Sequence, residues 1–187
     1  MKMNVLCSAA LALCLLVPAE SRADDIMAIT QKASSKCIDW DTNLPPDPSS
    51  RDAQLWSCGG NPPATTIRNQ VVGLRWVGRY GGGPWETYQI RSAVGGYSQC
   101  LSVAGNSQAN AARIVFTECQ DGNRAQMWMR AATNKDLTTT AKWINLNSGK
   151  CLDAPGTYDG VLLQQYDCAS SSWWPQDFKA YYTLPIP

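Results

Sequence analysis

The chain has 187 residues, contains no histidine, and balances 16 Lys and Arg against 15 Asp and Glu. Without histidine, the Ser-His-Asp and Cys-His arrangements of nucleophilic enzymes are excluded. A chain this close to neutral also lacks the excess of basic residues with which proteins bind nucleic acids or anionic membranes, so neither partner is expected.

Residues 1–23 are predicted to be a secretory signal peptide that is removed from the mature chain. Lys2 provides a positive start, Val5 to Val17 forms a largely apolar run, and Ser21-Arg22-Ala23 supplies small residues before the cleavage point. The run is shorter than the about 20 residues of a membrane span, and no later stretch is apolar enough to be a transmembrane segment. We therefore expect a secreted or periplasmic protein with a single domain over residues 24–187.

The pattern of the mature chain is a series of short strands separated by turns. In chain order, strands are expected at residues 26–29, 53–58, 71–80, 85–91, 113–119 and 161–166. Gly81-Gly82-Gly83-Pro84 is the strongest turn signal, and the Ala-rich segment 127–132 is the one place where a helical turn is expected. No window of about 11 residues or more shows a sustained 3.6-residue apolar period, which predicts an all-β barrel or sandwich.

One outline occurs three times along the chain. Its clearest copy, residues 149–178, contains Cys-Leu-Asp, a second cysteine and then Gln-Asp-Phe, and two earlier stretches follow the same order. Such repetition indicates copies of one supersecondary unit, with boundaries near residues 24–76, 77–128 and 129–187. Units that cannot each bury an apolar face alone are expected to close around a shared core.

Six cysteines remain after removal of the signal peptide, an even number that indicates disulfides in an exported chain. The threefold repeat selects one pairing, with each bridge inside its own unit: Cys37–Cys58, Cys100–Cys119 and Cys151–Cys168. A zinc site is not expected, because the chain has neither histidine nor a C-x-x-C pair. No metal or other cofactor is therefore predicted.

The succession of Cys-Leu-Asp, hydrophobic-x-x-Cys and Gln-x-aromatic, repeated three times, resembles the ricin B-type β-trefoil lectin family over nearly all of the mature chain. The resemblance implies three pseudo-symmetric four-strand units and a carbohydrate-binding protein without catalytic activity. It also implies that the aromatic residue of each Gln-x-aromatic packs in the shared core. This assigns Trp128 and Phe178 to the core and leaves Val72 at that position in the first unit.

In that family a sugar-binding repeat carries an acidic residue two positions after its first cysteine. A Gln and an aromatic residue stand four and two positions before its second cysteine, and an Asn-Gln pair follows. The resemblance therefore implies two carbohydrate sites: Asp39, Gln54, Trp56, Asn69 and Gln70 in the first repeat, and Asp153, Gln164, Tyr166 and Gln176 in the third, where Pro175 replaces the Asn.

The chemistry of these residues suits a sugar. Asp accepts charge-assisted hydrogen bonds from two hydroxyls, Gln and Asn both donate and accept, and an aromatic ring covers the C–H face. The competing interpretation is structural, because an Asp near a strand end often bonds turn amides, and Trp56 and Tyr166 could be half-buried strand residues. The second repeat has Ser102, Val115 and Thr117 at the equivalent positions and is expected to be structural only.

A second function is a toxin subunit. Free-standing single trefoils rich in surface aromatics resemble the cell-binding subunits of bacterial cytolethal distending toxin. By this resemblance, a catalytic protein partner would dock on an aromatic surface at Trp76 and Trp85 and on the proline-ended tail.

Two further classes have weaker support. A glycosidase would need a carboxylate pair about 5–9.5 Å apart, and nothing in the sequence singles out Asp39, Asp41 and Asp47 for that role. A protease inhibitor would need a rigid exposed loop such as residues 44–52, and the lectin-type repeat argues against it.

Overall fold

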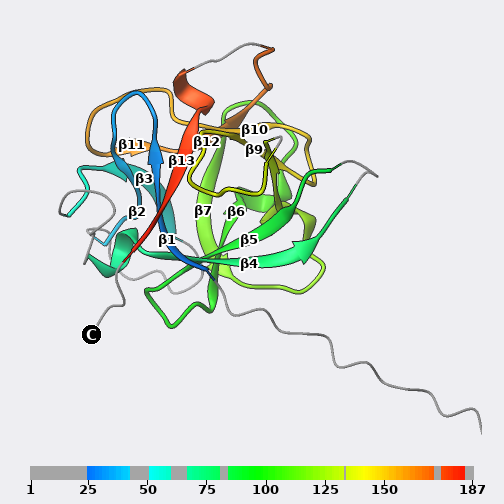
Figure 1. Cartoon of the computed structure of the whole chain (residues 1–187), viewed down its shortest axis with the longest axis horizontal. Helices are drawn as coiled ribbons and strands as arrows, with labels where there is room; N and C mark the ends of the chain where they lie inside the picture. The colour runs from blue at the N-terminus through cyan, green and yellow to red at the C-terminus, as the bar shows by residue number, and fades with distance from the viewer. Residues whose placement is uncertain are drawn as a thin grey trace, which may run out of the picture.

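The computed structural model describes residues 25–42, 51–59, 67–80, 84–132, 134–170 and 174–183. In these residues the regular structure consists of short strands and single 3-10 turns, which confirms the all-β prediction (Figure 1). The predicted signal peptide, most of the proline-containing loop 44–52, the glycine turn at 81–83 and the tail at 184–187 lie outside them. The strands are β1 (Asp25–Gln31), β2 (Cys37–Trp40), β3 (Arg51–Trp56), β4 (Val72–Gly78), β5 (Thr87–Ser92), β6 (Gln99–Val103), β7 (Ala112–Glu118), β8 (Trp128–Ala131), β9 (Lys142–Asn145), β10 (Cys151–Asp153), β11 (Val161–Leu162), β12 (Gln164–Tyr166) and β13 (Phe178–Tyr182).

Strands from all three repeats form a closed barrel. Along the ring, β13 pairs with β1, β1 with β4, β4 with β5, β5 with β8, and β8 with β9, and every pair is antiparallel. The ring closes where Ala141, just before β9, bridges Phe178 at the start of β13. In Figure 1, β1 and β13 run side by side, so the first and last described strands of the chain are neighbours.

The other strands form three hairpins, β2–β3, β6–β7 and β10–β12, which we call the cap. The hairpins hold one another, since β7 pairs with both β3 and β12, and β11 pairs with β3. Each hairpin leaves the barrel at the end opposite the connections β4–β5 and β8–β9. The arrangement is a β-trefoil whose three units are β1–β4, β5–β8 and β9–β13.

The predicted strand at 161–166 is divided into β11 and β12 by Leu163. Leu163 is fully buried, its N–H donates to the Ala53 carbonyl at 2.8 Å, and its carbonyl accepts from Ile114 N–H at 2.9 Å. The segment therefore passes from a partner strand in the first unit to one in the second. A change of partner ends β11, although the residue types continue to favour a strand.

The predicted helical turn at 127–132 was wrong, because residues 128–131 form strand β8. Trp128 and Arg130 are buried while Met129 and Ala131 are half-buried, which is the two-residue period of a strand. β8 pairs with β5 on one side and β9 on the other. These ladders in the barrel override the helix propensity of alanine.

The shared core lies inside the barrel and under the cap. Its largest fully buried side chains include Trp128, Trp143, Phe116 and Phe178, and Trp128 Nε1 donates to the Leu101 carbonyl at 2.9 Å. The ring of Trp40 stacks on Phe116 with centroids 5.3 Å apart. The core positions of Trp128 and Phe178 are thereby confirmed, and Val72, also buried, fills the corresponding place in the first repeat.

The three predicted disulfides are confirmed, with Cys37–Cys58, Cys100–Cys119 and Cys151–Cys168 separated by 21, 19 and 17 residues. Each bridge joins the first strand of a cap hairpin to a cysteine one or two residues beyond its second strand. Within the described ranges, no helix has the length and apolar character needed to cross a membrane. The same residues contain no group of three or more Cys, Asp or Glu placed to hold a metal ion.

Candidate functional site

The cap hairpins place the predicted site residues in equivalent positions. In each hairpin the residue two after the first cysteine pairs across the strands with the residue four before the second cysteine. The three pairs are Asp39 with Gln54, Ser102 with Val115, and Asp153 with Gln164. Register thus brings a carboxylate and an amide together in the first and third repeats, and a hydroxyl and an alkyl group in the second.

In the first repeat three amide groups converge on one carboxylate. Gln54 Nε2 donates to Asp39 Oδ1 at 3.1 Å, while Asn69 Nδ2 and Gln70 Nε2 donate to Asp39 Oδ2 at 2.9 and 3.0 Å. Asp39 is only 2% exposed. Asn69 and Gln70 belong to the 3-10 turn Arg68–Gln70, which contacts β2. A buried carboxylate with this many donors is fixed in position rather than free to rotate.

Burial raises the pKa of Asp39 to about 6, because the charged form loses its hydration. The hydrogen bonds from Gln54 and Gln70 lower it, and the negative charges of Asp41 and Asp159 add to the rise. The carboxylate is therefore ionised at neutral pH and becomes protonated in mildly acidic solution.

This raised pKa predicts a specific pH dependence of stability. The folded-state pKa of Asp39 lies above its unfolded value of about 3.9, so the group stabilises the fold fully below about pH 4 and loses that contribution as pH rises through about 6. We expect the free energy of unfolding of the native protein, relative to Asp39→Asn, to fall by about 2–3 kcal/mol between pH 4 and pH 7. Urea unfolding of both proteins at several pH values measures the difference, and parallel curves would contradict it.

The third repeat holds its carboxylate with fewer internal donors. Gln164 Nε2 donates to Asp153 Oδ1 at 2.8 Å and Gln176 Nε2 to Asp153 Oδ2 at 3.2 Å, and Asp153 is 4% exposed. Pro175 occupies the position of Asn69 and has no amide to donate. Each ionised carboxylate offers about four acceptor positions, so Asp153 retains more acceptor capacity for a ligand than Asp39.

One glutamine in each repeat supports the loop behind the site. The side-chain oxygen of Gln70, Gln126 and Gln176 accepts from a backbone N–H at 2.9, 2.8 and 2.9 Å respectively. The same three side chains donate through Nε2 to the carbonyls of Ser57, Glu118 and Asp167. All three are buried. The structure therefore places Gln70 and Gln176 behind the carboxylates, where they orient Asp39 and Asp153 rather than face solvent.

Two exposed rings lie at the open ends of the first and third hairpins, opposite the first cysteine of each. Trp56 is 39% and Tyr166 is 45% exposed, and each is two residues beyond the glutamine that holds the carboxylate. Because residues two apart on a strand share a face, Trp56 lies on the face of Gln54, and Tyr166 on the face of Gln164. The first and third repeats therefore combine a fixed acceptor with an apolar ring on one surface.

The residue after each ring is held by a different repeat, which was not predicted from the sequence. Ser57 N–H donates to Asp159 Oδ1 at 2.7 Å, and Lys36 Nζ reaches the same oxygen at 2.7 Å. In the third repeat, Asn110 Nδ2 donates to Asp167 Oδ2 at 2.7 Å, and Lys150 pairs with Asp167 Oδ1. These contacts lower the pKa of Asp159 and of Asp167.

One feature of the sequence could have indicated these contacts. A lysine, Lys36 or Lys150, stands immediately before the first cysteine of the two repeats that carry the acid, whereas the second repeat has Gln99 there. The lysines anchor the loop beside Trp56 and Tyr166.

The second repeat has a surface hollow where its cap hairpin carries Ser102 in place of the Asp. A hollow of about 400 Å³ is lined by Ser102, Thr117, Asn123 and Gln126 among others. Gln126 Nε2, which has no carboxylate to meet, donates to Thr117 Oγ1 at 3.0 Å. The hollow is polar and Glu118 also lines it, but at the positions of Asp39 and Trp56 it has Ser102 and Thr117.

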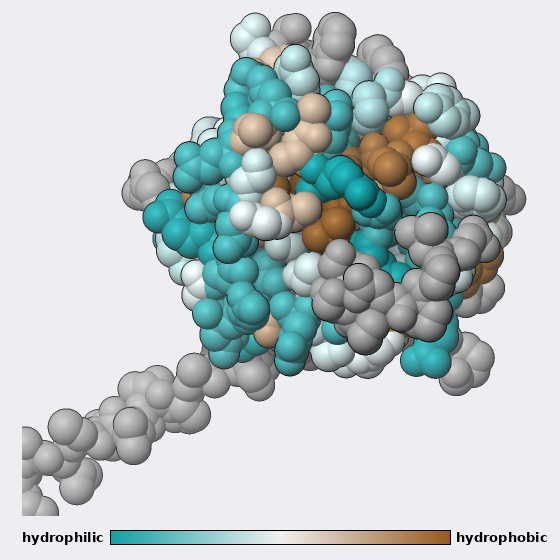
Figure 2. All heavy atoms as spheres, turned by 180° about the vertical axis from the view of Figure 1, so that it is seen from behind, coloured by the Kyte–Doolittle hydropathy of each residue, from teal (hydrophilic) through white to brown (hydrophobic). Residues whose placement is uncertain are grey.

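One face of the molecule is mainly hydrophilic. On the face seen in Figure 2, apolar residues reach the surface in separate patches surrounded by hydrophilic side chains. The exposed aromatics of the described chain include Trp76 and Trp85, which lie on the β4–β5 side of the barrel, away from the cap.

Comparison with known proteins agrees with this geometry. A family profile described as "Ricin-type beta-trefoil lectin domain-like" matches residues 74–166, which run from β4 to the end of β12. The chain is a β-trefoil that resembles the ricin B-type lectin domain. The resemblance inferred from the three repeats is thereby confirmed. A search of curated proteins finds no similar sequence.

Solved structures with this ricin-type fold are similar at low sequence identity. The designed threefold-symmetric protein ThreeFoil has a TM-score of 0.64 and 21% identity over 84% of this chain and 99% of its own. A Macrolepiota procera ricin B-like lectin, solved with lactose, has a TM-score of 0.59 and 16% identity over 86% of this chain and 96% of its own. A mosquitocidal holotoxin has a TM-score of 0.65 and 18% identity, and the chain spans only 17% of its length.

Proposed function

We propose that the protein is a secreted, non-catalytic lectin that binds glycans through its first and third repeats. The observation that carries the proposal is a buried carboxylate, held by glutamine amides and accompanied by an exposed ring, at two of three pseudo-equivalent positions. The lactose bound by the Macrolepiota lectin supports the class of ligand. Cell-surface glycans are the ligands that a secreted protein of this kind would meet.

Each site is expected to bind weakly. The sites are shallow, and each hydrogen bond to sugar replaces one to water, with a net gain of about 0.5–1.5 kcal/mol. We expect single-site binding free energies of about −4 to −6 kcal/mol, which correspond to high-micromolar or millimolar dissociation constants. Two sites on one rigid fold would gain from binding a branched or clustered glycan together.

Export is part of the proposal. Three disulfides form stably in oxidising compartments, and such compartments are reached by secretion. The predicted signal peptide, residues 1–23, agrees with this route. Detection of a protein that begins at Asp24 in the periplasm or culture medium would test it.

The binding proposal is tested on a glycan array with the native protein and Asp39→Ser/Asp153→Ser. The double variant introduces the residue that the second repeat already carries at this position, so the fold should be retained. Native binding to a related set of glycans, reduced at least about tenfold in the variant, is expected. Ser102→Ala is the matched control and should bind like the native protein. Equal binding by the native and double-variant proteins would contradict the proposal.

The second candidate function is a cell-binding subunit of a toxin. The observation that favours it is the exposure of Trp76 and Trp85, since surface tryptophans are enriched at protein interfaces. The similar trefoil in a mosquitocidal holotoxin supports that use of the fold. A stoichiometric complex with a nuclease-like protein, lost in Trp76→Ala/Trp85→Ala, would favour this function over a free lectin.

A further inference from the structure

A second kind of pocket lies at the end of the barrel opposite the cap. We call this end the barrel mouth: it is formed by the end of β4, the start of β5, the connection after β8, and the neighbouring ends of β1 and β13. Two adjoining hollows of about 170 and 330 Å³ open there and share Glu86, Tyr88 and Lys135. Neither contains a residue from the cap hairpins.

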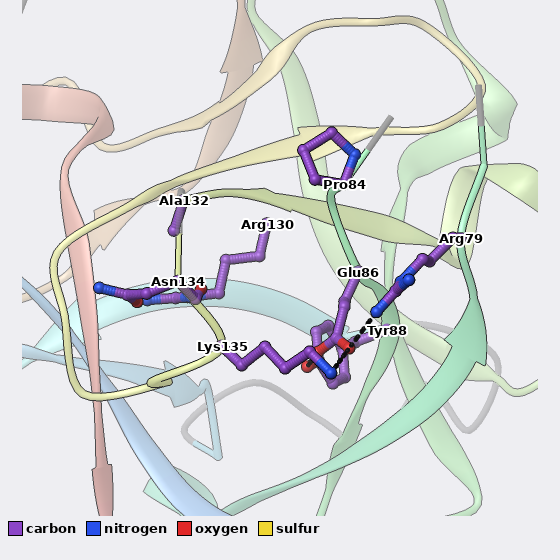
Figure 3. A pocket seen from close by; sticks show the side chains of 8 residues that line it. All are labelled: Arg79, Pro84, Glu86, Tyr88, Arg130, Ala132, Asn134 and Lys135. Carbon is purple, nitrogen blue, oxygen red and sulfur yellow. Dashed lines mark hydrogen bonds and ion pairs between the residues drawn. The ribbon is translucent and has the colours of Figure 1, made fainter. Parts of the chain in front are cut away.

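Glu86 is the central polar group of the barrel mouth. Figure 3 shows the side chains of Arg79, Lys135 and Tyr88 converging on its carboxylate. Tyr88 donates its hydroxyl to Glu86 Oε2 at 2.7 Å, but Arg79 and Lys135 lie 3.7 and 4.0 Å from Oε1. Neither Arg79 nor Lys135 is therefore within hydrogen-bond distance of Glu86 Oε1. Tyr88 therefore holds one carboxylate oxygen, and the two cations face the other one without a direct hydrogen bond.

The rim beside Glu86 is held by a buried arginine. Arg130 is 4% exposed, and its guanidinium donates to the carbonyls of Asn134, Asp136 and Thr139 at 3.1, 2.6 and 2.9 Å. Its backbone N–H donates to the Glu86 carbonyl at 3.0 Å. These bonds connect the segment that contains Lys135 to Glu86, the residue just before β5. Hydrogen bonds within the protein therefore fix the shape of the barrel mouth.

The larger hollow joins apolar and charged surfaces. The buried side chains of Leu74 and Leu137 line it, and two exposed rings, Trp76 at 43% and Tyr182 at 54%, stand at its edge. Asp25 adds a second carboxylate. Aromatic rings beside hydrogen-bonding carboxylates match the C–H face and the hydroxyl face of a pyranose.

The charges of the barrel mouth select a neutral ligand. Asp25 and Glu86 disfavour an anion, whereas Lys135 and Arg79 disfavour a cation that would otherwise suit the aromatic rings. A neutral molecule with several hydroxyls can donate to the carboxylates and accept from the ammonium and guanidinium groups. Its apolar face would cover Trp76 and Tyr182, whose exposed area is otherwise in water.

We infer that the barrel mouth is an additional carbohydrate site that takes one neutral sugar residue of a glycan, between Glu86, Trp76 and Tyr182. The inference rests on the proposed lectin function and adds a site outside the three pseudo-equivalent cap positions. A glycan bound at the barrel mouth would therefore contact the end of the molecule opposite the cap.

The test is a titration followed by two-dimensional ¹⁵N–¹H spectra, with lactose, N-acetylgalactosamine, N-acetylglucosamine and mannose as probes. In Asp39→Ser/Asp153→Ser we expect at least one sugar to shift the Trp76 indole and the amides of Glu86 and Tyr182. Adding Trp76→Ala or, separately, Tyr182→Ala should weaken that response at least tenfold. Tyr158→Ala, which removes an exposed ring that lines neither hollow, is the control and should leave the response unchanged.

The possible outcomes separate the two sites. Shifts at cap residues of the native protein without shifts at the barrel mouth would overturn this inference and leave the lectin proposal intact. Shifts at the barrel mouth alone would support the inference and overturn the assignment of binding to the first and third repeats. No shifts with any of the four sugars, or shifts at the mouth that survive both added substitutions, would also overturn it.

Discussion

At pH 7, Asp153→Ser is expected to cost more glycan affinity than Asp39→Ser. Asp153 receives two internal amide donors where Asp39 receives three, so the third repeat has more acceptor positions left for sugar hydroxyls. Hydrogen bonds to a charged group contribute about 1.5–3 kcal/mol, so loss of the carboxylate should weaken the third-repeat site by about 10- to 100-fold.

The two variants should be compared by titration with a glycan that is positive on the array, at a pH above the pKa of Asp39. The response of Trp56 reports the first repeat, and the response of Tyr166 reports the third. Ser102→Ala controls for substitution at the equivalent position of a repeat without an acid. A larger loss for Asp39→Ser than for Asp153→Ser would show that the additional amide donors strengthen a site rather than occupy it.

Trp128→Ala is expected to lower the free energy of unfolding by about 3–5 kcal/mol, the largest effect of any single substitution considered for this protein. Trp128 is fully buried in the core shared by the three repeats, so its removal leaves a cavity that the barrel cannot close. The Leu101 carbonyl also loses its hydrogen bond from the indole. Such a loss is a large part of the stability of an ordinary domain.

The matched control is Trp56→Ala, which deletes the same side chain at an exposed position of the cap. Its effect on the free energy of unfolding should stay within about 0.5 kcal/mol, as is usual for surface positions. Denaturant unfolding with the disulfides intact measures both. Similar losses in the two variants would mean that the stability of the trefoil does not depend mainly on its common core.

The repeat unit was predictable from the sequence because its markers are local. The cysteine pairs, the Asp-Gln pairs of the first and third hairpins and the buried aromatics Trp128 and Phe178 all follow from fixed spacings within one repeat. The strand at 128–131 was missed because its identity depends on two neighbours, β5 and β9, that are distant in sequence. Residue propensity carries no information about such partners.

The roles within the site were only partly predictable. Spacing brought Gln70 and Gln176 to the right place, but only the structure shows that they support a carboxylate and a loop from behind. The barrel mouth could not be predicted, since Asp25, Glu86 and Tyr182 are far apart in the chain and share no spacing rule. They meet because the barrel closes β1 against both β4 and β13.

The contacts that cross between repeats bear on how such a protein could arise by duplication. Ser57, beside the first ring, is held by Asp159 from the third repeat, and Asp167, beside the last ring, is held by Asn110 from the second. A polypeptide of one repeat would lack these partners unless further copies of itself supplied them. The smallest unit that could keep these loop contacts within one polypeptide is therefore larger than one repeat.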